Sequence, residues 1–304
     1  MLSSHADQAI DVFQRGSACY VNDLIVIDIA DDYEHADSSV EYALENVLYK
    51  PSKPDEDEDF ETLQELFNSI YTQNCSCTDS LCDSPRVCSH GGNYKILITS
   101  SGQKQLVLNS NRPCQDLIYE CSENCNCSPT CCNRLVQYGP RKGLEIIDIT
   151  LNNMEQKGLI TTRTIPKGAF ICEYAGEVLT KSEAARRLSR NKVNNRMNYI
   201  ICLNETPTES GQDRLQTFID PTEKGNIGRY LNHSCDPNCE ILSVRVGGPI
   251  PRLGIFAKKD IASLDELTFH YGGGRRESQE NQNDRIFCCC GSANCEKYLP
   301  NFDF

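Results

Sequence analysis

The sequence lacks the features that place a chain in or across a membrane. No stretch of its 304 residues approaches the roughly 20 consecutive apolar residues of a membrane-spanning helix. The first residues, MLSSHADQAIDVF, do not show the basic-then-apolar order of a secretory signal. We therefore expect a soluble, intracellular protein without a membrane partner.

A surplus of basic charge is also missing. The net charge is −13, and residues 1–70 hold 17 acidic residues against three basic ones, so the rest of the chain is nearly neutral. Sequence-specific DNA binding is not expected without a basic surface. The acidic segment either attracts a basic peptide or histone partner over long range or is a solvated tail, and both interpretations stay open.

Cysteine, by contrast, is abundant and unevenly placed. Most of the 19 cysteines lie between residues 75 and 132, and four lie within residues 288–295. Their number is odd, and the chain shows no export signal, which argues against a disulfide framework. Clusters of the form C-x-C suit metal thiolates, so zinc is the favoured ligand.

Changes in residue pattern divide the chain into five parts. Residues 1–70 are acidic and partly helical or disordered, with helical spacing over 40–48 and 61–70. Residues 71–137 contain too few apolar residues to build a core, so bound metal would supply the folding free energy. Residues 138–272 predict a mainly β domain, 273–287 a flexible linker and 288–304 a second cysteine module. Short strands are expected over 144–149, 169–173, 198–203, 217–219, 253–257 and 266–270, with one clear helix over 181–190 that begins after Thr180 and Ser182.

The first cysteine cluster resembles a known zinc module. It reads C-S-C-x4-C-x5-C-S-H from residue 75, then C-x3-C-N-C-x3-C from residue 121. This pattern is similar to the pre-SET module of the suppressor-of-variegation histone methyltransferases, which holds three zinc ions with nine cysteines. Either His90 or Cys114 is then the ninth ligand, and a histidine could take only a terminal position, because its nitrogen has one lone pair to give. The implied ligands are Cys75, Cys77, Cys82, Cys88, His90, Cys121, Cys125, Cys127 and Cys131.

The last cluster supplies three ligands, Cys288, Cys290 and Cys295. The resemblance implies Cys235 as the fourth ligand of a single post-SET zinc, which would tie the C-terminal tail to the catalytic domain. Cys132, Cys239 and Cys289 are left without a predicted metal.

A series of motifs between the two cysteine clusters resembles a SET domain. They are, in order, IPKG from residue 165, CEYAGEV from residue 172, NYI from residue 198, GNIGRYLNHSC from residue 225 and ELTFHY from residue 266. The likeness includes the methyltransferase half of SET–transposase fusion proteins. It implies the SET fold, a β-clip of short strands with a knot-like core. It also implies a protein-lysine N-methyltransferase that uses S-adenosylmethionine on a histone H3 tail or nucleosome, in the nucleus and on the chromosome.

The resemblance also assigns roles to single residues. Tyr271 is the catalytic tyrosine, Tyr174 hydrogen-bonds the target nitrogen, and Phe269 sets the number of methyl groups that fit. Because phenylalanine has no hydroxyl to hold a water against the amine, di- or trimethylation is predicted. The residues expected to bind the cofactor are Lys157, Gly158, Tyr199, Arg229, Asn232, His233 and Leu299.

Two departures from the family pattern bear on activity. Gln156 and Lys157 stand where the family usually has a glycine and often a tryptophan, and this chain contains no tryptophan. His270 replaces the aspartate that usually precedes the catalytic tyrosine. Three alternatives follow: a SET-fold chromatin-binding protein with impaired catalysis, a methyltransferase of non-histone lysines, and a purely structural zinc protein. If the substrate is a histone, lysine nine and lysine thirty-six of H3 are both candidate targets.

Overall fold

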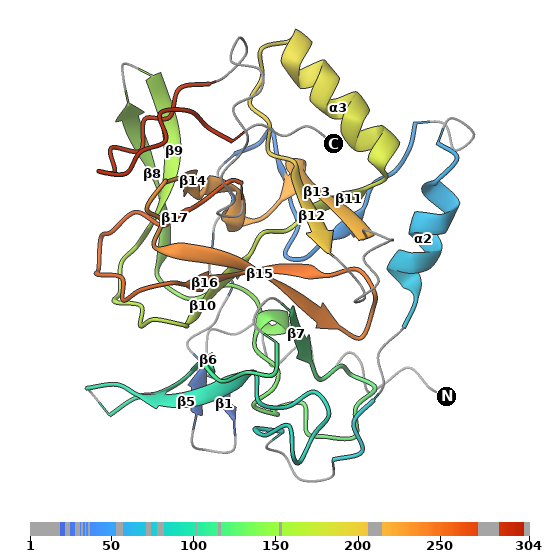
Figure 1. Cartoon of the computed structure of the whole chain (residues 1–304), viewed down its shortest axis with the longest axis vertical. Helices are drawn as coiled ribbons and strands as arrows, with labels where there is room; N and C mark the ends of the chain where they lie inside the picture. The colour runs from blue at the N-terminus through green and yellow to red at the C-terminus, as the bar shows by residue number, and fades with distance from the viewer. Residues whose placement is uncertain are drawn as a thin grey trace.

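Short β-strands form most of the regular structure in the computed structural model of the chain (Figure 1). The residues that it describes are 19–21, 25–27, 31, 33, 35, 37–52, 57–70, 74–77, 82–100, 102–114, 117–151, 154–205, 215–272 and 286–300. Most of the predicted linker, 273–287, therefore lies outside the described residues. Within the described part, no helix has the length and apolar character that crossing a membrane requires.

A four-stranded sheet joins the cysteine-rich region to the predicted β domain. Its strands lie in the order β10 (Phe170–Glu173), β16 (Arg252–Ala257), β15 (Cys239–Val246) and β7 (Leu117–Glu120). β7 leads directly into the second half of the cysteine cluster and pairs in parallel with β15. Most apolar side chains of this sheet, such as those of Phe170 and Phe256, are buried, whereas Tyr119 is exposed. One hydrophobic core therefore continues from the cysteine-rich region into the part of the chain that resembles a SET domain.

A second sheet carries the N-terminal region on its edge. Its path is β12 (Ile201–Glu205), β13 (Leu215–Gly225), β11 (Gly176–Leu179) and β4 (Val47–Leu48), and β3 (Glu41–Tyr42) pairs with β13. The helix predicted over 40–48 is wrong. Val40, Ala43 and Tyr49 bury their side chains, and the backbone between them pairs with β11 and β13.

Both long helices start where sequence signals place them. α3 (Lys181–Val193) extends the helix predicted over 181–190, and the Thr180 hydroxyl caps it by accepting from the Glu183 N–H at 3.2 Å. Ser182 does not cap but donates to Asp57 at 3.0 Å. α2 (Phe60–Asn68) confirms the helical spacing over 61–70. Two short 3-10 helices, η2 (Val136–Tyr138) and η3 (Ile227–Tyr230), complete the helical elements among the described residues.

Paired strands outside the two sheets frame the rest of the domain. Three are antiparallel hairpins: β1–β2 (Cys19–Val21 and Ile25–Ile27), β5–β6 (Tyr94–Ile98 and Lys104–Leu108) and β8–β9 (Leu144–Leu151 and Met154–Thr161). The fourth pair is parallel and joins β14 (Asn232–His233) to β17 (Thr268–Phe269). The predicted strands over 198–203 and 266–270 are thus shorter or shifted, beginning at Ile201 and Thr268.

Candidate active site

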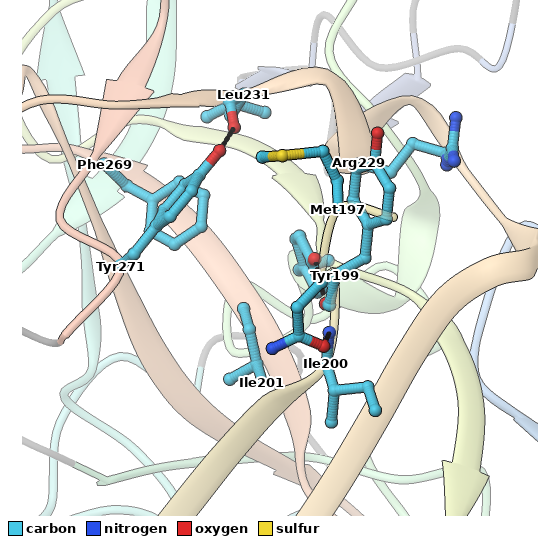
Figure 2. A pocket seen from close by; sticks show the side chains of 10 residues that line it. Met197, Tyr199, Ile200, Ile201, Arg229, Leu231, Phe269 and Tyr271 are labelled. Carbon is cyan, nitrogen blue, oxygen red and sulfur yellow. Dashed lines mark hydrogen bonds between the residues drawn. The ribbon is translucent and has the colours of Figure 1, made fainter. Parts of the chain in front are cut away.

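One pocket gathers the predicted catalytic residues. It lies where the chain enters β12, beside η3 and the end of β17, and encloses roughly 370 Å³ of space that is partly open to solvent. Figure 2 shows Tyr271 and Phe269 on one side of this space and Tyr199 and Arg229 on the other. The residues that line it are Tyr174, Met197, Asn198, Tyr199, Ile200, Ile201, Arg229, Leu231, Phe269 and Tyr271.

The side chains of Tyr174, Tyr271 and Phe269 lie together at one end of the pocket. The Tyr271 hydroxyl donates to the Leu231 carbonyl at 3.3 Å, and the Tyr174 hydroxyl donates to the Tyr199 carbonyl at 2.6 Å. The Phe269 ring centroid lies 4.9 Å from that of Tyr271 and 6.0 Å from that of Tyr174. Burial raises the pKa of both tyrosines above the ordinary value. They are therefore neutral hydrogen-bonding groups at physiological pH.

Arg229 brings a positive charge to the opposite wall. Its guanidinium lies 4.7 Å from the Tyr199 ring centroid and 5.0 Å from that of Tyr230. The Arg229 Nε donates to the Pro221 carbonyl at 3.0 Å. Only 8% of the side chain is exposed, so this cation is fixed in place beside the pocket.

Asn232 and His233 form β14, which pairs with β17 beside Phe269. The Asn232 amide donates to the Lys157 carbonyl at 3.1 Å and to the Glu266 carboxylate at 2.8 Å. The His233 Nδ1 accepts from the Tyr271 N–H at 3.2 Å and so fixes the backbone of Tyr271. Burial, with His270 nearby, lowers the pKa of His233 to about 4, so its ring is neutral at physiological pH.

The strand that carries the unusual Gln156-Lys157-Gly158 sequence has ordinary backbone geometry. Gln156 pairs with Ile149 within the β8–β9 hairpin and does not have a positive φ. A glycine is therefore not required at Gln156 for backbone reasons. Gly158 is different, because a Cβ there would lie 2.2 Å from the Ile149 Cδ1 atom. The Lys157 ammonium forms an ion pair with Asp148 at 2.9 Å, and only its backbone carbonyl contacts Asn232.

His270, the second departure, faces the C-terminal module. Its Nε2 lies 3.8 Å from the Glu296 carboxylate, and its Nδ1 accepts from the Gly272 N–H at 3.2 Å. The ring also lies edge-on to His233, with centroids 4.9 Å apart. A side chain at Gly272 would come within 3.0 Å of Pro300, so the tail that carries Leu299 returns to the segment that follows Tyr271.

The first cysteine cluster forms a buried group of sulfurs with one imidazole. Three sets of four ligand atoms lie within 4.8 Å of one another. Cys75, Cys82 and Cys121 each belong to more than one of these sets, whereas His90 belongs to one, with Cys75, Cys121 and Cys125. Cys77 packs against the same cluster, and Cys114 is exposed and outside all of these sets. Thiolate and imidazole at such spacing are the donors that tetrahedral zinc prefers.

The second cluster brings Cys235 to the C-terminal tail. Its sulfur and those of Cys288, Cys290 and Cys295 also lie within 4.8 Å of one another. Cys235 lies two residues after His233, the last residue of β14, so a metal here would join the tail to the chain that leads from Leu231 in the pocket wall. Cys132 and Cys239 are buried in apolar clusters, and Cys289 belongs to neither metal group.

Several pocket residues were not identified from the sequence. Met197 reaches across the pocket toward Tyr271 and Leu231, although half of its surface is exposed (Figure 2). Asn198, Ile200 and Ile201 line the pocket beside it. Their only sequence signal is that they flank Tyr199, and Leu231 is recognisable only as the neighbour of Asn232.

Comparisons with known proteins agree with this geometry. A family profile described as SET domain matches residues 156–272. The probable histone-lysine N-methyltransferase set-23 of Caenorhabditis elegans is 39% identical over 237 residues, covering 77% of this chain and 89% of the relative. The histone-lysine N-methyltransferase SETMAR of Bos taurus is 37% identical over 246 residues, covering 77% of this chain and 76% of the relative.

Solved structures show the same fold. The methyltransferase domain of human histone-lysine N-methyltransferase SETMAR matches with a TM-score of 0.66 and 32% identity, covering 88% of this chain and 91% of that one. Arabidopsis thaliana SUVH6 matches with a TM-score of 0.61 at 24% identity, covering 91% of this chain and 53% of that one. At that identity, SUVH6 is evidence for the fold alone.

Proposed function

The chain belongs to the SET-domain family of histone-lysine N-methyltransferases, and from this premise we propose that it methylates a lysine of a histone H3 tail with S-adenosylmethionine. Lysine nine and lysine thirty-six are the two candidate targets. The proposed locations are the nucleus and the chromosome. The protein would be built as pre-SET (71–137), SET (138–272) and post-SET (288–304) modules behind an acidic N-terminal region.

The observation that supports this proposal is the convergence of Tyr174, Tyr271 and Phe269 at one end of a pocket whose other wall holds Arg229. S-adenosylmethionine would supply a methyl group on a positively charged sulfur. Transfer requires a neutral lysine amine aligned with that methyl, and positioning of two reactants supplies much of an enzyme's rate acceleration. Two neutral phenols at fixed positions can orient an amine by hydrogen bonds without themselves gaining or losing a proton.

The same pocket lowers the cost of neutralising the lysine. An unperturbed lysine titrates near 10.4, so deprotonation at pH 7 costs roughly 4–5 kcal/mol. Burial among aromatic rings and a nearby cation both favour the neutral amine. Phe269, which is 4% exposed, adds an apolar surface and no hydroxyl, which supports di- or trimethylation.

The cysteine clusters support four zinc ions, three in the pre-SET module and one in the post-SET module. Cys75 and Cys82 each belong to two of the sets of four ligands and Cys121 to all three. We assign each of these three sulfurs to two ions, which leaves one position for Cys77, which belongs to none of the sets but packs against the cluster. Cys77, Cys88, His90, Cys125, Cys127 and Cys131 would be terminal ligands. Three bridging and six terminal ligands satisfy three tetrahedral ions, with His90 in a position that needs only one bond.

A transfer assay tests the function. Zinc-loaded protein is incubated with tritiated S-adenosylmethionine and histone octamers in which H3 lysine nine or thirty-six is replaced by arginine. We expect label on H3, lost when the target lysine is replaced. In the Tyr271→Phe variant kcat should fall roughly 10²–10³-fold. Tyr119→Phe, at an exposed tyrosine outside the pocket, is the matched control.

Two outcomes would change the proposal. Binding of the methyl donor with no transfer to any protein would replace it with a SET-fold chromatin-binding protein that has lost turnover. Label on non-histone proteins alone would keep the chemistry and overturn the histone substrate.

A further inference from the structure

The acidic N-terminal region reaches the wall of the pocket. The Asp37 Oδ2 lies 3.7 Å from the Arg229 Nη1, with 28% of the Asp37 side chain and 8% of the Arg229 side chain exposed. Asp37 lies well before residue 156, where the SET-domain match begins. The ion pair therefore connects the pocket to a part of the chain that the motifs do not cover.

Local hydrogen bonds hold the Asp37 carboxylate in position. Its Oδ1 accepts from the Ser39 N–H at 3.0 Å and from the Ser39 hydroxyl at 2.5 Å. This leaves Oδ2 to face Arg229. On the other side, the Arg229 Nε donates to the Pro221 carbonyl at 3.0 Å. The guanidinium is thus held between Asp37 and Pro221, with its carbon over the Tyr199 ring.

Backbone pairing fixes the segment that carries Asp37. β3 pairs with Lys224 and Gly225 of β13, and the Ala43 N–H donates to the Gly225 carbonyl at 2.9 Å. The Asn226 amide donates to the Leu44 carbonyl at 3.3 Å. Asn226 is also the N-cap of η3, the short helix that contains Arg229. The segment and the pocket wall are therefore attached to the same turn of the chain.

We propose that Asp37 is a positioning residue for methyl transfer, which holds Arg229 against Tyr199 and so connects residues 37–49 to the wall of the pocket. This inference rests on the proposed function, because it assigns a role within that same pocket. Removal of one partner from a buried ion pair leaves an uncompensated charge, which turns toward water or another anion. Without Asp37, the Arg229 guanidinium would leave the Tyr199 ring, and the wall facing the methyl donor would loosen.

Three variants of the full-length, zinc-loaded chain test this role. Asp37→Asn removes the charge and keeps the size, and Asp37→Glu restores the charge. Glu41→Gln is the matched control, because Glu41 lies on the same segment and pairs with Lys224 at 2.8 Å, at a site where 68% of the Glu41 side chain is exposed. The measurements are calorimetric affinity for S-adenosylmethionine, kcat and KM for methyl transfer, and the melting temperature.

We expect Asp37→Asn to weaken donor affinity and raise its KM roughly three- to tenfold, with kcat within about twofold of wild type. Asp37→Glu should recover part of this loss, and Glu41→Gln should match wild type. Equal affinity of Asp37→Asn and wild type would overturn the inference. So would an equal loss in Asp37→Asn and Glu41→Gln accompanied by lower melting temperatures, since that indicates general loosening of the segment. A wild-type protein that does not bind the donor would instead refute the proposed function.

Discussion

Three aromatic rings of similar shape meet in the pocket, those of Tyr174, Tyr271 and Phe269. They differ in that the two tyrosines carry a hydroxyl group and Phe269 does not. Each hydroxyl of the two tyrosines is bonded to a backbone carbonyl, of Tyr199 and Leu231 respectively. Phe269 faces both rings at centroid distances of 6.0 and 4.9 Å and offers no polar atom. The space between these three rings, where we propose that the target amine binds, is therefore polar on two sides and apolar on the third.

The apolar side predicts the product. Phe269→Tyr would add a hydroxyl that can bind a water molecule. That water would occupy the space that a methylated amine needs in order to rotate for a second methyl transfer. The variant should accumulate monomethyl-lysine, whereas wild type proceeds to di- or trimethyl-lysine. Mass spectrometry of the H3 peptide over time measures this distribution. Phe287→Tyr, at a phenylalanine with 70% exposure, should leave it unchanged. Unaltered products in Phe269→Tyr would show that another residue limits the methyl count.

Glu173, next to Tyr174 of the pocket, predicts a pH dependence of stability. Its Oε1 is buried and accepts no hydrogen bond from the residues that the structure describes. Burial raises its pKa from 4.5 to about 7, despite Arg252 at 3.4 Å. A raised carboxyl pKa means that the folded state binds the proton more tightly than the unfolded state does. The stabilising contribution is therefore complete below the ordinary pKa and is lost as pH rises to about 7.

Glu173→Gln removes this titration. The variant should therefore be more stable than wild type, and this difference in the free energy of unfolding should grow as pH rises. It should be about 2 kcal/mol larger at pH 7 than at pH 5.5 and change little above pH 7. Urea unfolding in zinc-containing buffer at pH 5.5, 7 and 8.5 gives the comparison. A constant difference across this range would mean that Glu173 is ionised throughout.

Between elements, a buried ionic network attaches α3 to the second sheet. Arg187 on α3 contacts Glu177 of β11 at 2.7 Å, Asp220 of β13 at 2.9 Å and Glu183 of its own helix at 2.7 Å. None of these side chains is more than 10% exposed. A single guanidinium thus compensates three carboxylates at the junction of one helix and two strands.

Loss of Arg187 should destabilise the fold strongly. Arg187→Ala leaves Glu177 and Asp220 buried and unpaired, which is expected to cost about 3–5 kcal/mol. Arg186→Ala is the control, because Arg186 pairs with the same Glu183 but is 60% exposed and should cost at most about 1 kcal/mol. Chemical denaturation measures both. Similar values for the two variants would contradict the buried network.

Sequence reasoning succeeded for elements whose signals are local. α3 is indicated by the Thr180 cap, and β16 by a short apolar run between turns. β3 and β4 were missed because they exist only through pairing with β13 and β11, which lie far along the chain. The same reason applies to the site. Tyr174, Tyr271 and Asn232 stand within motifs, whereas Met197 and Asp37 reach the pocket only through the fold.

For the molecule as a whole, a cluster of cysteines that could hold metal takes the place of an apolar core at one end. Seven of the cysteines around His90 form a hydrophobic cluster of their own, separate from the cores of the sheets. β7, the edge strand of the four-stranded sheet, ends at Glu120 and is followed directly by Cys121, so loss of a metal there would also disturb the sheet. Chelation should therefore unfold the cysteine-rich loops first and then weaken the pairing of β7 with β15.

Metal content gives the sharpest test of this arrangement. Elemental analysis should find about four zinc ions per chain. His90→Ala should lose about one zinc and His90→Cys should retain all of them, because either an imidazole or a thiolate can be a terminal ligand. Cys114→Ser, at an exposed cysteine outside the clusters, should lose none. Loss of zinc in Cys114→Ser and not in His90→Ala would mean that Cys114, and not His90, is the ninth ligand of the first cluster.

The parallel pairing of β14 with β17 has a consequence for how the protein acquires its shape. His233 and Tyr271 lie 38 positions apart, and the β15–β16 hairpin lies between them in the chain, so we expect the hairpin to form before they meet. Contacts between distant positions are slow to form because long loops must close first. In a refolding experiment, the spectroscopic signal of the strands should therefore recover before catalytic turnover does, and a newly made chain should pass through a folded but inactive stage.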